Sequence, residues 1–318
     1  MPLFHADVPQ DLHGRPRLDK YLASLPGGMS RSKLKGGVTE IFINGARAKL
    51  ASRVRAGDAI DIEWEENVPA GIEPEDIPLA VIYEDDDVCV LDKASGMVTH
   101  PASGNWTGTL VNALLFRWGR SAVELSAGCS AAEALAERRP GIVHRLDKDT
   151  SGVIITARSG GAAEFLQSQF QRRSLKKEYI AIAAGIPAQL HGTIRTQIIR
   201  DPADRKRFKA VTGTADGKYA ETDYRVFATY GDYSLVRLRL RTGRTHQIRV
   251  HLRYIGCPVL GDAVYGRKDR RFPDAALMLH ARCLEIRIPC GKKMRFVAAV
   301  PERFKLALRK LKVMYGKR

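Results

Sequence analysis

The chain has 318 residues, 44% of them hydrophobic, and a net charge of +17 at pH 7. This size and apolar content suffice for two or three folded domains and exclude wholesale disorder, and no apolar run approaches the length of a membrane-spanning helix. The charge is uneven: residues 1–65 carry +2, residues 66–87 carry −8 and residues 88–318 carry +23, which favours a polyanion partner, most simply nucleic acid, over a merely solubilising surface.

The cysteines and the start of the chain predict a cytoplasmic protein with no membrane association. Five scattered cysteines without a C-x-x-C pair argue for reduced thiols and against a zinc ribbon. Residues 1–7 lack the basic and then apolar regions of a secretory signal.

Residues 1–65 have the pattern of a compact domain with both helices and strands. The expected elements are a helix over 18–25, a second helix begun by Ser30, a hairpin over 40–47 turning at Asn44-Gly45, and a strand over 54–62. The second helix carries Arg31, Lys33 and Lys35. An acidic linker rich in Glu, Pro and Gly is expected over 66–78.

Four short segments of this domain are similar in type and spacing to the small RNA-binding domain first seen in a ribosomal small-subunit protein (the S-four-like domain). They are Arg17-Leu18-Asp19, Ser30-Arg31-Ser32, Ile43-Asn44-Gly45 and Val54-Arg55-Ala56-Gly57-Asp58. The resemblance implies that Arg31, Lys33 and Lys35 contact RNA phosphates, which set position without reading bases. The alternative is a helix surface that happens to be basic.

The remaining residues, 79–318, predict one large α+β domain. The expected elements are strands over 79–83, 88–91, 153–156, 176–182, 234–241, 279–281 and 296–301, and helices over 109–116, 248–255 and 304–318. Residues 119–139 form a poorly patterned insertion whose role the sequence does not indicate.

A polar loop at 144–152 lies between apolar runs, the usual setting for a site on a rigid scaffold. Its candidate reactive groups are Asp147 and Asp149, since the cations Arg145 and Lys148 can keep a carboxylate ionised.

The second dense polar stretch is 242–252. Gly243 allows a tight turn from which Arg244 can project and grip a carboxylate with two bonds. His246 and His251 are five residues apart with no neighbouring carboxylate, so we expect no metal. Elsewhere, Tyr179 can stack on a base.

Other familiar sites are excluded by their missing motifs. The chain has no G-x-x-x-x-G-K-[ST] loop, no G-x-G-x-x-G after a strand and no nucleophile elbow. What remains is an aspartate-centred site with arginines and a tyrosine, in which an ionised carboxylate can act as a nucleophile.

Several motifs, in order over roughly 80–301, resemble those of the RluA-type pseudouridine synthases. They are Asp92-Lys93-x-Ser95-Gly96-x-x-x-His100-Pro101, the loop from His144 to Gly152, Lys177-Glu178-Tyr179, the stretch from Thr242 to Leu252, Gly261-Asp262-x-x-Tyr265-Gly266 and Leu279-His280-Ala281. The resemblance implies a mixed, mainly antiparallel sheet with flanking helices and a central cleft. It also implies isomerisation of uridine in RNA to pseudouridine without cofactor or metal.

The resemblance also assigns roles. Asp147 would be the nucleophile, attacking either the ribose anomeric carbon or the uracil ring. Tyr179 would stack on the flipped uracil and take the ring proton, and Arg244 would pair with Asp147. Arg145 would lie near the backbone or the space left by the flipped base. Ile248 would wall the pocket.

The remaining residues of these motifs take lesser roles. His100 would bind substrate, Asp149 would bond the loop's own amides, and His144, Thr150 and Ser151 would fix the loop.

Within the family, the small RNA-binding domain favours large-subunit ribosomal RNA as substrate, with transfer RNA as the alternative. The rival hypotheses are a non-catalytic RNA-binding or ribosome-assembly protein and a different aspartate-dependent enzyme, such as a hydrolase. We expect a monomer. Which uridine is modified cannot be read from the sequence.

Overall fold

The computed structural model describes residues 3–25, 34, 38–64, 72–101, 105–119, 141–204, 207–213 and 217–316. The chain divides into two compact units, Met1–Gly71 and Ile72–Arg318. Among the described residues, no helix is both long and apolar enough to cross a bilayer. Each unit is described by itself.

The smaller unit is a four-stranded antiparallel sheet with a short helix. Its strands follow the order β1 (Leu3–Asp7), β4 (Ala59–Trp64), β2 (Val38–Ile43), β3 (Ala46–Arg47), and its helix is α1 (Leu18–Ser24). The predicted turn is present: Asn44 and Gly45 have φ of 52° and 76°, as a two-residue hairpin turn requires. Leu18 and Leu22 pack with Ile60 in its core. The predicted phosphate contacts Arg31, Lys33 and Lys35 lie outside the described residues.

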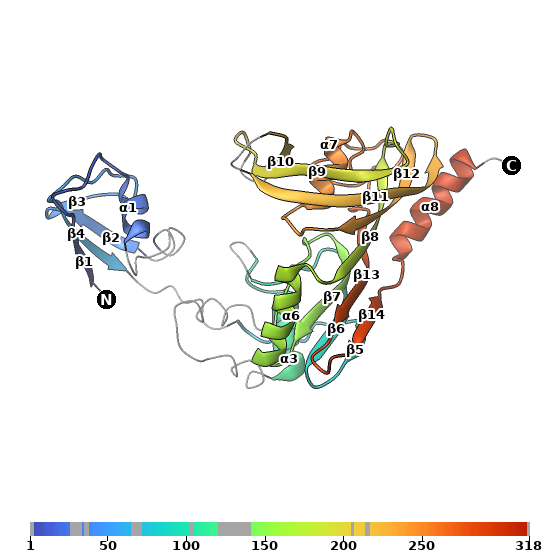
Figure 1. Ribbon diagram of the computed structural model, residues 1–318, viewed down its shortest axis with the longest axis horizontal. Helices are drawn as coiled ribbons and strands as arrows, with labels where there is room; N and C mark the ends of the chain where they lie inside the picture. The colour runs from blue at the N-terminus through green and yellow to red at the C-terminus, as the bar shows by residue number, and fades with distance from the viewer. Residues whose placement is uncertain are drawn as a thin grey trace. The chain divides into compact units, whose positions relative to one another are not determined.

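The larger unit is built on one ten-stranded sheet (Figure 1). Its strands are, in spatial order, β10 (Phe208–Val211), β9 (His191–Arg200), β11 (Lys218–Tyr230), β12 (Tyr233–Leu240), β8 (Lys176–Ala184), β13 (Leu279–Arg287), β7 (Ser151–Ala157), β6 (Val88–Lys93) and β5 (Val81–Glu84), with β14 (Lys293–Val297) paired to β13. Every pair is antiparallel except β13 with β7. The predicted mixed, mainly antiparallel sheet is confirmed.

Helices flank this sheet, as expected. They are α3 (Leu110–Trp118), α6 (Gly160–Arg172), α7 (Gln247–Tyr254) and α8 (Glu302–Tyr315). Figure 1 shows α7 beside β10 and α8 beside β11, which the contacts between these elements bear out. Thr109 begins α3 through a capping box with Asn112.

Part of the segment predicted as a linker belongs to the larger unit. The Asn112 side chain donates to the Glu73 carbonyl at 2.7 Å, and the Glu75 amide donates to the Asn112 carbonyl at 3.0 Å. Residues 66–71 lie outside the described residues, so the linker over 66–78 and the domain bounds 1–65 and 79–318 stay predictions.

The strand β7 is buried along its whole length because helices cover both of its faces. Val153 and Ile155 pack with Leu166 of α6, whereas Ile154 packs with Leu110 and Leu114 of α3. This explains the uninterrupted apolar run in the sequence. It also holds the polar loop that precedes β7 on a rigid element.

Candidate active site

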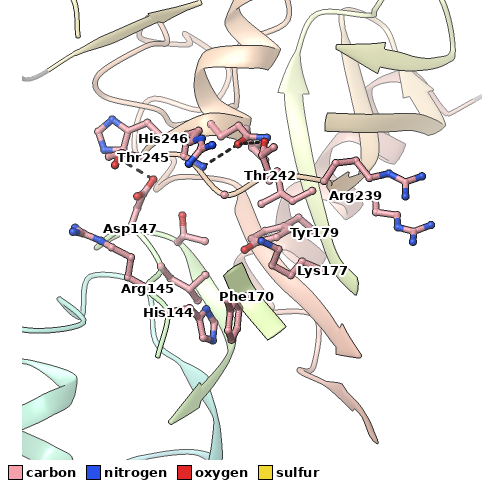
Figure 2. A pocket seen from close by; sticks show the side chains of 18 of the residues that line it. His144, Arg145, Asp147, Phe170, Lys177, Tyr179, Arg239, Thr242, Thr245 and His246 are labelled. Atoms are coloured by element: carbon pink, nitrogen blue, oxygen red, sulfur yellow. Dashed lines mark hydrogen bonds and ion pairs between the residues drawn. The ribbon is translucent and has the colours of Figure 1, made fainter. Parts of the chain in front are cut away.

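A cavity of about 430 Å³ brings the two dense polar stretches of the sequence together. Its lining includes five predicted site residues, Arg145, Asp147, Tyr179, Arg244 and Ile248. In the view of Figure 2, Asp147 and His246 lie at one side of the cavity, and Tyr179 and Lys177 lie at the other. His100 is not among the lining residues, so its predicted substrate contact stays a prediction.

The polar loop is held from behind by a buried lysine. Lys93 is only 2% exposed, and its ammonium donates to the carbonyl oxygens of Ala94 and Met97, each at 2.8 Å, and of Lys148 at 3.0 Å. Burial lowers the pKa of Lys93 to about 8, although the carboxylates of the loop oppose this shift. One side chain thereby ties the 92–101 motif to the residue that follows Asp147.

Two hydroxyl groups of the 92–101 motif also donate hydrogen bonds to the backbone of the loop. Thr99 donates to the Leu146 carbonyl at 3.0 Å, and Ser95 donates to the Asp149 carbonyl at 2.7 Å. The expectation that the Asp149 carboxylate bonds the loop's own amides was wrong. Asp149 is exposed, and the described hydrogen bond uses its backbone oxygen, because the neighbouring motif already fixes the loop.

The far end of the loop is fixed by β13 and α8. Ser151 Oγ accepts from the Arg303 guanidinium at 2.6 Å and lies 2.9 Å from His280 Nδ1, so Ser151 fixes the loop as predicted. Gly152 has φ of 116°, and a Cβ there would lie 2.2 Å from the Ala281 carbonyl oxygen. Only glycine allows this close approach of β7 and β13.

Asp147 is paired with Arg249, not with Arg244 as predicted. Its Oδ2 lies 3.4 Å from Arg249 Nη1, and the carboxylate side chain is 20% exposed. Arg244 instead donates from Nε to the Tyr219 carbonyl at 3.1 Å. The physical reason is orientation: Arg249 projects from α7 toward the loop, whereas Arg244 lies in the turn before that helix.

A second carboxylate holds the guanidinium of Arg249. Asp262 accepts from Arg249 Nε at 2.7 Å and from Nη2 at 2.8 Å, and also from the amides of Val264 and Tyr265. Burial alone would raise the pKa of Asp262, but the bonds from Arg249 and these amides lower it below its usual value. Asp262 belongs to the 261–266 motif, and holding Arg249 is what this motif contributes to the site.

His246 begins α7 in a left-handed conformation, with φ of 55°. Its Nδ1 lies 2.8 Å from Tyr265 Oη, and its Nε2 lies 4.0 Å from Asp147 Oδ2. Burial lowers the pKa of His246, although the charge of Asp147 opposes the shift. The direction of this shift favours the neutral imidazole.

The opposite wall is aromatic and cationic. Tyr179 is 8% exposed, and burial followed by the charge of Asp147 raises the pKa of its phenol. Burial, then the charges of Arg173 and Arg244, lower the pKa of Lys177 to about 8. Such a wall suits a planar base attached to phosphates.

His144 fixes the loop, as predicted. Its ring stacks on Phe170 with centroids 4.5 Å apart, and its Nε2 accepts from the Ile155 amide at 3.0 Å. Thr150 does not show such a role: within the described part of the chain its buried hydroxyl has no hydrogen-bond partner.

Most other polar side chains of the 242–252 stretch are structural. Gln247 donates to the Glu221 carbonyl at 3.0 Å and to Thr222 Oγ1 at 2.9 Å. His251 is fully buried between the hydroxyls of Thr196 and Thr222. Within the described ranges, no three His, Cys, Asp or Glu side chains are grouped so that they could hold a metal ion.

Comparisons with known proteins indicate the family of the chain. Residues 87–254 match the family model described as RNA pseudouridylate synthase. An uncharacterized RNA pseudouridine synthase of Chlorobaculum parvum is 41% identical over 317 residues, with 94% of each chain covered. The ribosomal large subunit pseudouridine synthase D of Borreliella burgdorferi is 40% identical, over 92% of this chain and 88% of that protein.

A solved structure leads to the same family. Human RNA pseudouridylate synthase domain containing 4 superposes with a TM-score of 0.56 at 25% identity, over 73% of this chain and 93% of that one. With an aspartate, an arginine and a tyrosine converging in one cavity and relatives matched along nearly its whole length, the chain belongs to the RNA pseudouridylate synthase family and is an isomerase of that family.

Proposed function

We propose that Asp147 is the nucleophile with which this enzyme converts uridine in RNA to pseudouridine. The observation that carries the proposal is the position of its carboxylate, which lines the cavity 3.4 Å from Arg249. An arginine at this distance can orient the carboxylate, and an oriented carboxylate can act as a covalent nucleophile. The proposal holds for attack on either the anomeric carbon or the uracil ring.

The proposed reaction needs no cofactor or metal because it is balanced within the substrate. The bond from N1 of uracil to C1′ of ribose breaks, and a bond from C5 to C1′ forms. C5 releases one proton, and N1 gains one. No electron is transferred to or from another molecule, so a nucleophile and proton transfers suffice.

The other predicted residues take roles around the flipped base. Tyr179 would stack on the uracil and Ile248 would wall the pocket. Because its pKa is raised, the phenol of Tyr179 keeps its proton at neutral pH. Tyr179 can therefore accept the proton from C5 only if it donates its phenolic proton to another group in the same step. Arg145 and Arg244 would contact phosphates beside the flipped nucleotide, and His100 stays a candidate substrate contact.

The decisive experiment compares Asp147→Asn with Asp149→Asn. Both remove one carboxylate from the same loop, but only Asp147 lines the cavity. We expect Asp147→Asn to abolish pseudouridine formation while RNA affinity stays within a few fold, and Asp149→Asn to stay active. Robust product formation by Asp147→Asn would overturn the assignment.

This experiment also separates the rival hypotheses. A non-catalytic RNA-binding or ribosome-assembly protein predicts RNA binding without any uridine conversion by the wild-type chain. A hydrolase predicts release of free base or phosphate, neither of which an isomerase yields.

We propose large-subunit ribosomal RNA as the substrate. The name of the Borreliella burgdorferi relative, which refers to the ribosomal large subunit, supports this choice, and so does the RNA-binding domain expected over 1–65. Mapping pseudouridines in ribosomal and transfer RNA from cells lacking the protein tests it. A site lost only from transfer RNA would favour the alternative substrate.

We also propose that residues 1–65 bind RNA through Arg31, Lys33 and Lys35. If they contact phosphates, removing residues 1–65 should weaken binding to structured RNA and reduce its salt dependence. An unchanged salt slope would contradict this role.

We further propose that the enzyme works as a monomer in the cytoplasm. The free thiols of Cys89, Cys257, Cys283 and Cys290 are consistent with a reducing compartment. Sedimentation of the RNA-free enzyme would test the monomer.

A further inference from the structure

His246 lies between Asp147 and Tyr265, and neither the sequence motifs nor the proposed mechanism gives it a task. Its two ring nitrogens face different partners: Nδ1 is 2.8 Å from Tyr265 Oη, and Nε2 is 4.0 Å from Asp147 Oδ2. Which nitrogen carries the proton decides what the ring can offer the carboxylate.

The environment of Tyr265 settles the position of that proton. Tyr265 is 2% exposed, and its oxygen accepts from the Phe208 amide at 2.9 Å. An amide cannot accept in return, so the single phenolic hydrogen is available for His246 Nδ1. The opposite arrangement would leave a buried hydroxyl hydrogen without an acceptor among the described residues, which is costly. Nδ1 therefore accepts, and the proton is on Nε2.

Two other buried histidines also have Nδ1 beside a hydroxyl that accepts a second bond. Thr222 Oγ1 accepts from Gln247 Nε2 at 2.9 Å and faces His251 Nδ1 at 2.8 Å. Ser151 Oγ accepts from Arg303 and faces His280 Nδ1 at 2.9 Å. For His251 the hydroxyl can then donate to Nδ1 while Nε2 faces Thr196 Oγ1 at 3.0 Å. His280 Nε2 has no hydrogen-bond partner among the described residues, so only His251 repeats the arrangement of His246.

The Nε2–H of His246 and the guanidinium of Arg249 both lie nearest to the same oxygen of Asp147. Both distances are measured to Oδ2, at 4.0 Å and 3.4 Å. Both are longer than the 2.7 Å and 2.8 Å bonds that Arg249 makes with Asp262. Contacts of this kind often tighten only when substrate is bound. Two donors at Oδ2 would fix the rotation of the carboxylate and leave Oδ1 toward the cavity.

We propose that His246, held in the Nε2–H form by Tyr265, is a second positioning donor to Asp147 Oδ2, which makes Oδ1 the attacking oxygen. The proposal rests on the role of Asp147 proposed above. It assigns His246, Tyr265 and the amide of Phe208 to one chain that runs from the edge strand β10 to the nucleophile.

Two substitutions of His246 separate a donor role from a backbone role. The amide nitrogen of Gln can stand in for Nε2, whereas Asn is too short to reach Asp147. The left-handed φ of 55° is adopted more readily by Asn than by Gln, so a purely backbone role predicts that the Asn variant is the more active one. A donor role predicts that His246→Gln keeps kcat within about 10-fold of wild type and His246→Asn loses about 100-fold, with KM for RNA little changed in both. Equal activities, or an Asn variant more active than the Gln variant, would overturn the proposal.

Nitrogen-15 NMR of histidine-labelled enzyme tests the tautomer without reference to activity. The His246 resonance, assigned by its loss in His246→Asn, should report a proton on Nε2 at pH 7. Tyr265→Phe keeps the ring that lies 5.1 Å from the Arg249 guanidinium but removes the hydroxyl, so the tautomers should become mixed. A proton on Nδ1 in the wild type, or an unchanged Nε2–H form in Tyr265→Phe, would refute the arrangement.

The two tests fail separately from the proposed function. A wild-type enzyme that forms no pseudouridine would overturn the proposed function, whereas the NMR result would still report whether Tyr265 sets the tautomer of His246.

Discussion

The loop at 144–152 and the stretch at 242–252 are both dense in polar residues, yet the structure uses their side chains in opposite ways. The loop is fixed mainly through its backbone: Lys93, Ser95 and Thr99 donate to its carbonyl oxygens. Its Asp147 and Arg145 are therefore left to line the cavity.

The 242–252 stretch fixes itself through side chains instead. Gln247 alone takes part in four hydrogen bonds: it accepts from Thr242 and the Arg244 amide and donates to Glu221 and Thr222. Within this stretch, Arg249 makes the ion pair to Asp147 and His246 approaches the same carboxylate. A high density of polar residues thus marks both segments. Which of their side chains remain available to the cavity depends on whether the backbone of the segment is fixed by other residues or by its own side chains.

The largest effect is expected where the loop depends on one side chain. Lys93→Met keeps most of the volume but leaves three carbonyl oxygens in or beside the loop without their donor. We expect a loss of about 3 kcal/mol or more in the free energy of unfolding, together with most of the activity, because unmatched buried polar groups are costly. Urea denaturation measures the first and pseudouridine formation the second.

The matched control is Ser95→Ala, which removes a single, solvent-exposed hydrogen bond to the same loop. This substitution should lower the free energy of unfolding by no more than about 1 kcal/mol. If Lys93→Met were as stable as this control, backbone fixation of the loop by Lys93 would be wrong.

A smaller effect is expected in the second segment, where several side chains share the task. Gln247→Leu removes four hydrogen bonds at similar volume and should cost about 2 kcal/mol of stability and at least 10-fold in kcat, because α7 carries Arg249. Gln169→Leu makes the same chemical change on α6, where the Gln169 side chain, within the described residues, exchanges hydrogen bonds with the backbone of Arg287. That variant should lose stability but retain kcat, and equal losses of kcat in both would contradict the distinction.

Acidification affects both segments at once through buried histidines and needs no substitution. Burial lowers the pKa of His251 and of His280 from 6.5 to about 4. The unfolded chain therefore binds more protons between these values, so this stabilisation is complete above about pH 6.5 and is lost as the pH falls toward 4. We expect a loss on the order of 2 kcal/mol for each histidine by pH 5.

Urea midpoints between pH 7.5 and 5 measure this loss. His280→Asn, whose side-chain oxygen can still accept from Ser151, should lack the share of this loss that His280 contributes, on the order of 2 kcal/mol. A midpoint that is independent of pH in the wild type would argue against neutral buried imidazoles.

The sequence predicted well what depends on neighbouring residues. The Asn44-Gly45 turn, the helix at 109–116 and the strand at 234–241 follow from local preferences, and the structure contains all three. The placement of Asp147 in a cavity followed from a polar loop between buried runs.

The partner of Asp147 could not be predicted from local pattern. Arg244 and Arg249 both follow the turn at Gly243, and choosing between them requires the direction of α7 and the position of Asp262, thirteen residues beyond Arg249. Likewise, the sequence around Lys93 predicts an ordinary exposed charge at the end of a strand. Its burial becomes evident only when the loop 55 residues later closes over it.

The parallel pairing of β7 with β13 has a consequence for the order in which the enzyme is assembled. Ser151 meets His280, 129 residues later, and Arg303, 152 residues later. Contacts over such distances form late in folding, and those to the C-terminal segments cannot form until these have been synthesised. A growing chain that already contains Asp147, Tyr179 and Arg249 would therefore still lack the contacts that β13 and α8 make with the end of the 144–152 loop. The loop should therefore be fully fixed only after β13 and α8 have been synthesised and have folded against β7.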